Sequence, residues 1–91
     1  MKPSDKLLPT ILDAIGHTPM VRLSRIIPKS GASLALKLES LNPGGSSKDR
    51  IAVALVDAAE REGRLRPGGT IVEATAGNTG IALAMVAAVL G

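Results

Sequence analysis

The chain has 91 residues, of which 45% are hydrophobic and 21% are charged, a balance typical of a globular protein rather than a disordered one. A domain of this size buries little more than about 60% of its unfolded surface, so there is room for one domain only. Phe, Tyr and Trp are absent, so aliphatic residues must form the whole core. The net charge of +3 comes from scattered basic residues, and this argues against nucleic-acid binding.

The absence of Cys excludes disulfides, thiolate-bound zinc and a cysteine nucleophile, and it suits a reducing, cytoplasmic setting. His17 is the only histidine and Asp13 is the acid nearest to it, so we expect neither a Ser-His-Asp site nor a metal site. The longest apolar run, residues 81–90, falls short of the roughly 18 residues that indicate a membrane span. We expect a protein without a targeting segment or membrane contact.

The first predicted element is a short helix near residues 9–15, where apolar residues recur at helical spacing and Gly16 stands at the terminating position. Residues 20–23 are extended in character, and the polar stretch 24–33 is a connector. Leucines then alternate with other residues over 34–39, which predicts a strand with at least one buried face.

A helix is predicted over residues 48–62, with Ser46 as a candidate N-cap. Residues 70–74 form a second predicted strand, and the polar loop 75–80 follows it. The pattern over residues 81–90 predicts a helix. This helix is apolar on nearly every side and should be buried on several faces. In the helix predicted over residues 48–62, the apolar side comprises Ile51, Leu55, Ala58 and Ala59.

The order strand, helix, strand, helix describes one βαβ unit with a following helix. Strands 34–39 and 70–74 should therefore be parallel neighbours joined by a right-handed crossover. Parallel strands need cover on both faces, and two strands with two helices cannot supply it. We expect the chain to be the N-terminal piece of a longer α/β protein.

The loop over residues 75–80 has the composition of a small anion site. Its two glycines let backbone N–H groups approach a ligand, and the start of a helix favours a carboxylate or phosphate. The alternative is a capped turn in which Asn78 and Thr79 only close the helix end.

Lys48 follows a loop of glycines and serines and precedes a helix. A cation there opposes the helix dipole, so the pKa of its amine should be lowered, and a neutral amine can form a Schiff base with an aldehyde such as pyridoxal phosphate. The alternative is an ordinary surface lysine, and we expect Asp49 and Arg50 to pair with neighbours on the solvated side. The spacing fits neither a P-loop nor a dinucleotide fingerprint.

Three segments occur in order: IGHTPMVRL at 15–23, NPGGSSKDR at 42–50 and EATAGNTG at 73–80. Together they resemble the N-terminal part of the pyridoxal-phosphate-dependent cysteine synthase and cystathionine β-synthase family, which is of fold type II. The resemblance covers residues 11–91, nearly the whole chain.

The resemblance implies a three-layer α/β fold with a parallel sheet, of which this chain holds an N-terminal βαβα portion. Residues 1–33 would belong to the larger domain of the complete enzyme, and residues 34–91 would form part of its smaller α/β domain. The family's glycine-rich phosphate loop and the side chain facing the pyridine nitrogen would come from beyond residue 91.

The resemblance also implies residue roles. Lys48 would be the catalytic Schiff-base lysine and would move the substrate's α-proton, and Asn78 would hydrogen-bond the 3-oxygen of the cofactor ring. The family usually has Ser in place of Ala76, so one hydroxyl donor is lost, at a cost of about 0.5–1.5 kcal/mol. The loop that binds the substrate carboxylate would comprise Thr75, Ala76, Gly77, Asn78 and Thr79.

The implied activity is β-replacement, in which an activated serine resembling O-acetylserine reacts with sulfide to give L-cysteine. The implied partners are the amino-acid substrate, the sulfur donor and, in the complete enzyme, a second copy in a homodimer. The alternatives are condensation of serine with homocysteine, as in cystathionine β-synthase, and a non-enzymatic βαβ module that binds an anion.

We predict that the isolated chain of 91 residues is marginally stable or aggregation-prone. Ordering it costs on the order of 100 kcal/mol of conformational entropy, and its apolar C-terminal helix has no evident partner layer. It should neither bind pyridoxal phosphate tightly nor make cysteine. A soluble monomer with a cooperative thermal transition and cofactor-dependent β-replacement would contradict this prediction.

Overall fold

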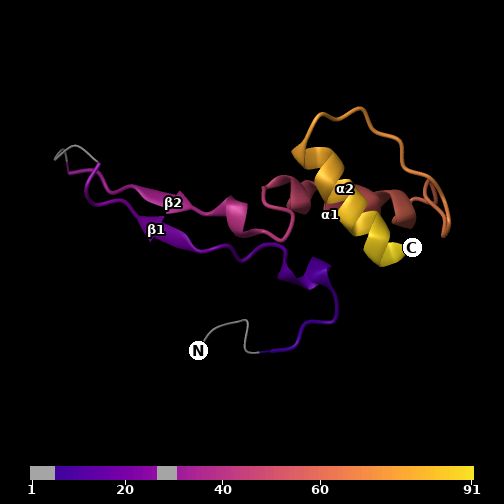
Figure 1. Ribbon diagram of the computed structural model, residues 1–91, viewed down its shortest axis with the longest axis horizontal. Helices are drawn as coiled ribbons and strands as arrows, with labels where there is room; N and C mark the ends of the chain where they lie inside the picture. The colour runs from indigo at the N-terminus through magenta and orange to yellow at the C-terminus, as the bar shows by residue number, and fades with distance from the viewer. Residues whose placement is uncertain (1–5, 27–30) are drawn as a thin grey trace.

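The computed structural model describes residues 6–26 and 31–91 and measures 54 × 33 × 21 Å. Its two parts are an extended two-stranded hairpin and a pair of packed helices, joined through short turns (Figure 1). Parts of the predicted segment 1–33 and of the connector 24–33 lie outside the described residues.

The first element, η2 (Ile11–Ala14), is a 3₁₀ turn and is shorter than the predicted helix. Thr10 and Asp13 cap it reciprocally: Thr10 Oγ1 accepts the Leu12 N–H at 3.1 Å, and Asp13 Oδ2 accepts the Thr10 N–H at 3.1 Å. Gly16 follows the turn with a φ of 86°, the left-handed conformation expected of a terminating residue. Leu12 packs against the helix core.

Strands β1 (Met20–Arg22) and β2 (Ala35–Lys37) pair antiparallel, with Val21 opposite Leu36. The hairpin projects away from the helices (Figure 1), and all six residues of the two strands are exposed, with Leu36 at 50%. The prediction that the strand over residues 34–39 has a buried face is therefore wrong for the described residues. Alternation indicates which side chains share a face, and it does not supply the layer that covers them.

The predicted parallel pairing of the two strands is also wrong for the described residues. Residues 70–74 are exposed and have no strand partner, whereas β2 pairs with β1. A parallel ladder requires cover on both faces, and here α1 and α2 pack on each other. Pairing with β1 also closes a shorter loop than a crossover through a helix. The described residues thus form a two-stranded sheet and a helix pair, without a three-layer sheet.

Helices α1 (Lys48–Arg61) and α2 (Asn78–Leu90) pack together and form the core. An alanine on each helix, at positions 52 and 82, is almost fully buried and lets the two backbones approach closely. The remaining core residues, with the partly buried side chains packed against them, are Val56, Leu83 and Val86, with Leu12, Val53 and Leu65.

The buried face of α1 differs from the predicted one. Ala58 and Ala59 are half-buried, but Ile51 is 44% exposed and Leu55 is 55% exposed. The buried residues of α1 are instead Asp49, Ala52 and Val56, of which Ala52 and Val56 belong to the core shared with α2.

Helix α2 begins at Asn78, three residues earlier than predicted, and it is covered on one face by α1 and η2. Ile81 is 53% exposed and Leu90 is 50% exposed, so the expected burial on several faces is absent from the described part of the chain. No helix in this part of the chain is long and apolar enough to cross a membrane.

The packing predicts different costs for two valine truncations. Val86→Ala removes methyl groups from a side chain that is 1% exposed, and it should lower the free energy of unfolding by about 1–3 kcal/mol. Val72→Ala alters a side chain that is 88% exposed and should change it by less than about 0.5 kcal/mol. Urea denaturation followed by circular dichroism measures both, and equal losses would contradict this helix packing.

Candidate functional site

The predicted site residues lie at the starts of the two helices. Lys48 is the first residue of α1 and Asn78 is the first residue of α2. Both helices begin at the same end of the pair (Figure 1). The structure therefore brings the Lys48 turn and the loop over residues 75–80 to one end of the helix layer.

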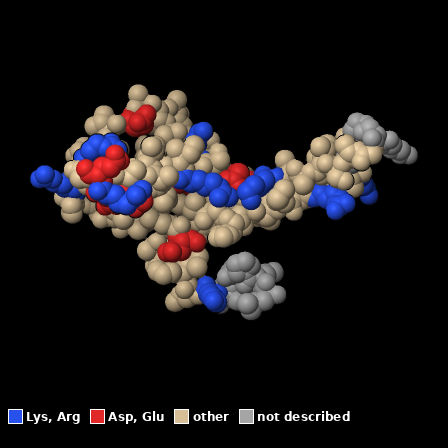
Figure 2. All heavy atoms as spheres, turned by 180° about the vertical axis from the view of Figure 1, so that it is seen from behind, with Lys and Arg blue, Asp and Glu red and all other residues tan. Residues whose placement is uncertain are grey.

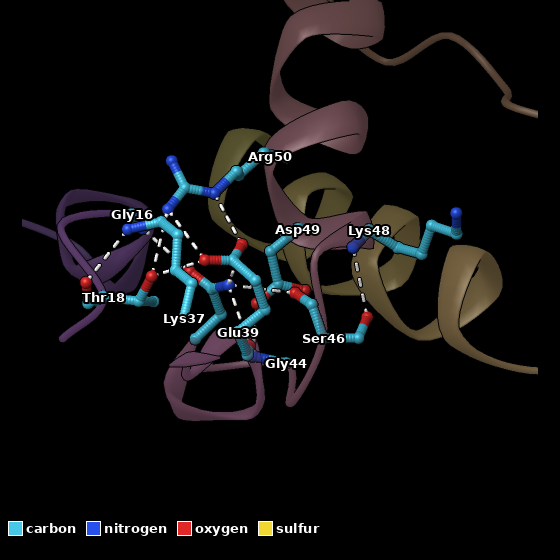
Figure 3. Close-up of polar contacts among 10 residues, drawn as sticks. Gly16, Thr18, Lys37, Glu39, Gly44, Ser46, Lys48, Asp49 and Arg50 are labelled. Carbon is cyan, nitrogen blue, oxygen red and sulfur yellow. Dashed lines mark hydrogen bonds and ion pairs between the residues drawn. The ribbon is translucent and has the colours of Figure 1, made fainter. Parts of the chain in front are cut away.

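Lys48 is held through its backbone, while its side chain is exposed. Its N–H donates to Ser46 Oγ at 3.2 Å. The N-cap position itself is Ser47, which makes no side-chain capping bond, so the predicted cap Ser46 acts from one position earlier. Figure 3 shows the Lys48 side chain extending away from the polar contacts around Glu39. Among the described residues, no hydrogen bond or ion pair involves its Nζ.

Asp49 is fully buried, so the prediction that it pairs on the solvated side is wrong. Its Oδ2 accepts the Gly44 N–H at 2.6 Å, and its Oδ1 has no hydrogen-bond partner. A Cβ at Gly44 would lie 2.9 Å from Asp49 Cγ, so glycine is needed for this close approach. Helical spacing places Asp49 in line with Ala52 and Val56, and this is the signal that could have indicated its burial.

Arg50 pairs with Glu39, which confirms that it has a charged partner and places that partner on a distant segment. Arg50 Nε lies 2.7 Å from Glu39 Oε1, and Nη2 lies 3.0 Å from Oε2, a two-pronged contact. Hydrogen bonds from Arg50, then from Thr18 and Asn42, lower the pKa of Glu39 to about 2, while burial of the carboxylate acts in the opposite direction. The bond to Glu39 raises the pKa of Arg50.

Asn42 joins this pair to the first sequence motif and is 4% exposed. Its Nδ2 contacts Glu39 O at 2.9 Å, Glu39 Oε1 at 3.1 Å and Ser46 O at 3.1 Å, and its Oδ1 accepts the Gly16 N–H at 2.8 Å. Gly16 leaves room for the guanidinium, since a Cβ there would lie 3.2 Å from Arg50 Nη1. Sequence reasoning missed Glu39 and Asn42 as site-forming residues, because each has a partner on a distant segment: Arg50 and Thr18 for Glu39, and Gly16 for Asn42.

Thr18 completes the junction between these segments and is 7% exposed. Its hydroxyl contacts Glu39, and its carbonyl accepts Lys37 Nζ at 3.0 Å. His17, between Gly16 and Thr18, is exposed and has a φ of 48°, a left-handed conformation in which His is enriched.

The loop before α2 is closed by Thr75. Its Oγ1 accepts the Gly77 N–H at 3.3 Å and the Gly80 N–H at 3.1 Å. A hydroxyl has two acceptor sites and one donor hydrogen, so the Thr75 hydrogen remains to be donated to something else. Thr75 therefore caps the start of α2, and neither Asn78 nor Thr79 caps the helix in the described structure.

The same loop presents backbone donors. The N–H groups of Ala76, Asn78 and Thr79 have no acceptor within the described residues. Residues 75–78 are exposed and Thr79 is half-buried. Free N–H groups at the positive end of a helix dipole suit a carboxylate or phosphate.

The surface around these helices carries mixed charge. Figure 2 shows acidic and basic side chains interspersed over the helix pair on the face drawn. Asp57 and Arg61 form an exposed pair at 3.0 Å, and Glu62 and Arg64 form another at 2.9 Å, as expected of solvated helix charges. Over residues 6–26 and 31–91 there is no cluster of three or more potential metal ligands.

Known proteins share this chain's sequence and fold. Residues 11–91 match the family described as pyridoxal-phosphate dependent enzyme. Cysteine synthase B of Pseudomonas aeruginosa is 54% identical over 83 residues, which cover 91% of this chain and 28% of that protein. O-ureido-L-serine synthase of Streptomyces lavendulae is 59% identical over 85 residues, covering 93% and 26%. Cystathionine beta-synthase of Rattus norvegicus is 54% identical over 90 residues, covering 97% and 16%.

A crystal structure of O-ureido-L-serine synthase superposes on the chain with a TM-score of 0.87 and 58% identity, covering 94% of this chain and 27% of that one. The chain thus spans between 16% and 28% of the length of these relatives.

We predict a pH-dependent cost for Glu39→Gln. The pKa of Glu39 falls from 4.5 to about 2 on folding, so the carboxylate stabilises the folded chain fully above pH 4.5, and this contribution is lost as the pH falls through 2. The melting temperatures of the native chain and the variant should therefore differ at pH 7 and converge near pH 2. Asp57→Asn, in an exposed pair, is the matched control and should shift melting less. A constant difference across this range would refute the assignment.

Proposed function

Because the chain belongs to the pyridoxal-phosphate-dependent enzyme family, we propose that it carries the lysine and the substrate-carboxylate loop of an enzyme that replaces the β-substituent of a serine derivative. The specific reaction proposed is formation of L-cysteine from an activated serine resembling O-acetylserine and sulfide. The observation that carries the proposal is the exposed amine of Lys48 at the same end of the helix pair as the unpaired N–H groups that begin α2.

The residues at the two helix starts suit the cofactor. Lys48 has an exposed primary amine, the group needed to bond covalently to the aldehyde of pyridoxal phosphate. Asn78 is exposed and has an amide that can donate to the oxygen on the cofactor ring. The bound cofactor supplies an electron sink that eases loss of the proton from the substrate α-carbon.

Lys48 also suits the role of the base that takes this proton. Its backbone is tied to Ser46, while its side chain is free to move between partners. In the non-enzymatic alternative Lys48 would only be a charge partner of the anion bound by the loop over residues 75–80, and it would form no covalent bond.

The loop before α2 suits the substrate carboxylate. Both acceptor sites of the Thr75 hydroxyl are occupied by the Gly77 and Gly80 N–H groups. Toward a ligand this hydroxyl can therefore act only as a hydrogen-bond donor. Ala76 offers its backbone N–H without a side-chain hydroxyl. We infer weaker carboxylate binding than with serine at this position, by about 0.5–1.5 kcal/mol.

A second candidate reaction is condensation of serine with homocysteine, and the 54% identity to a cystathionine beta-synthase favours it. Both reactions use an amino-acid substrate and a sulfur donor, and both place the same demands on Lys48 and the carboxylate loop. Cytoplasmic action and a homodimer of the complete enzyme remain predictions.

The test places residues 1–91 in front of the remainder of Pseudomonas aeruginosa cysteine synthase B, in place of its own matching segment. In this chimera Lys48→Ala should abolish the pyridoxyl group that borohydride fixes on the Lys48 peptide, and turnover should fall about 10²–10⁴-fold. Asn78→Ala should slow turnover but keep the covalent attachment. Mass spectrometry of peptides and a cysteine assay measure these effects.

Lys6→Ala is the matched control, because Lys6 is exposed and lies far from α1 in the sequence. It should leave attachment and turnover unchanged. If the Lys48→Ala chimera kept a reducible cofactor at the native level, the assignment of Lys48 would be wrong. Assays with O-acetylserine and sulfide, and with serine and homocysteine, decide between the two reactions.

A further inference from the structure

We propose that the Glu39–Arg50 ion pair is a positioning device for Lys48. It fixes the rotation of the first turn of α1 about the helix axis, and so the direction in which Lys48 leaves that turn. This inference rests on the proposed function of Lys48 and adds Glu39 and Arg50 to it as positioning residues.

Three consecutive residues begin α1, and each leaves the helix in a different direction. Successive residues of an α-helix are rotated by about 100°, so Lys48 and Arg50 point to nearly opposite sides. Figure 3 shows Arg50 turned toward Glu39 and Thr18, and Lys48 turned away from them. A rotation of the turn that moved Arg50 would therefore swing Lys48 by the same angle.

The hydrogen bond of Asp49 does not by itself set this rotation relative to the segments that hold Thr18 and Glu39. Asp49 is bonded to Gly44, five residues away, in the loop that leads directly into the helix. That loop and the first turn can move together without breaking the bond. Arg50, in contrast, reaches Glu39 at a separation of 11 residues and Thr18 at a separation of 32.

The geometry of the pair suits an orienting role. Two parallel contacts, at 2.7 and 3.0 Å, hold the plane of the Arg50 guanidinium against the Glu39 carboxylate. Thr18 and Asn42 donate to the same carboxylate, so Glu39 is itself held in place. A single point charge at either position would attract its partner without fixing an angle.

The same helix contains a comparison pair. Arg61 and Asp57 are also 3.0 Å apart, but they lie four residues apart on the distal part of α1, with side chains 72% and 61% exposed. This pair joins the helix only to itself. Removing it should leave the direction of the first turn unchanged.

The experiment uses the chimera described above, freed of cofactor. We measure the rate at which added pyridoxal phosphate becomes fixed by borohydride on the Lys48 peptide, and separately the rate at which trinitrobenzenesulfonate modifies the same amine. Glu39→Gln and Arg50→Gln should each slow cofactor attachment about tenfold or more, because a misplacement of about 1 Å can cost a hundredfold in rate. Modification by the small reagent should change less than about twofold, since it needs no particular direction of approach.

The double variant Glu39→Gln with Arg50→Gln should be no slower than the slower single variant, because both changes break the same contact. Arg61→Gln should attach cofactor at the native rate. Val86→Ala, which loosens the core, should lower the melting temperature and leave the attachment rate unchanged at temperatures where the chimera is folded.

Native attachment rates in the Glu39 and Arg50 variants would overturn the proposal, as would an equal loss in Val86→Ala, which would reduce the pair to a structural role. Additive losses in the double variant would also overturn it. If the unsubstituted chimera fails to attach cofactor at Lys48, the proposed function fails and this inference fails with it. The unsubstituted chimera therefore distinguishes the two failures.

Discussion

The candidate site depends on the hydrogen bonds that the side chain of Asn42 makes. Asn42 is 4% exposed and bonds to the Gly16 N–H, to Glu39 and to the Ser46 carbonyl. These contacts join the turn after η2, the η3 turn (Glu39–Leu41) and the loop that leads into α1. A buried amide that lost one of these partners would leave a polar group unsatisfied, which costs about 1–3 kcal/mol. The three segments are therefore coupled, and none can shift without disturbing the start of α1.

This coupling gives a physical reason for the residues found between positions 42 and 50. Gly44 admits the Asp49 carboxylate, which no side chain at that position would allow. The Ser46 hydroxyl accepts the Lys48 N–H, and Arg50 reaches Glu39. The backbone around Lys48 is thus restrained on several sides while its amine stays exposed, an arrangement that suits a covalent role better than a structural one.

Packing between the helices brings the second half of the site to the first. Ala52 and Ala82 are at most 1% exposed, and their small side chains let α1 and α2 lie close together with their first turns at the same end. Thr75 then closes the start of α2 with two accepted hydrogen bonds. The proposed anion binding by this loop rests on that closure, because a hydroxyl hydrogen and several N–H groups are left without an acceptor among the described residues.

The sequence by itself determined the features that depend on near neighbours along the chain. Helical periodicity located α1 and most of α2, Gly16 marked the end of the first turn, and three motifs indicated the family. Lys48 and the loop over residues 75–80 were identified in the same way, because a helix start and its preceding loop are local.

Only the tertiary structure decided the partners. The pairing of β2 with β1 and the contact of Arg50 with Glu39 both join segments that are distant in the sequence. The exposure of Ile51 and Leu55 has the same origin, since periodicity defines an apolar face without stating which element covers it. The physical reason is that burial and pairing are gained by surfaces brought together across the fold, whereas propensity and capping act within a single turn.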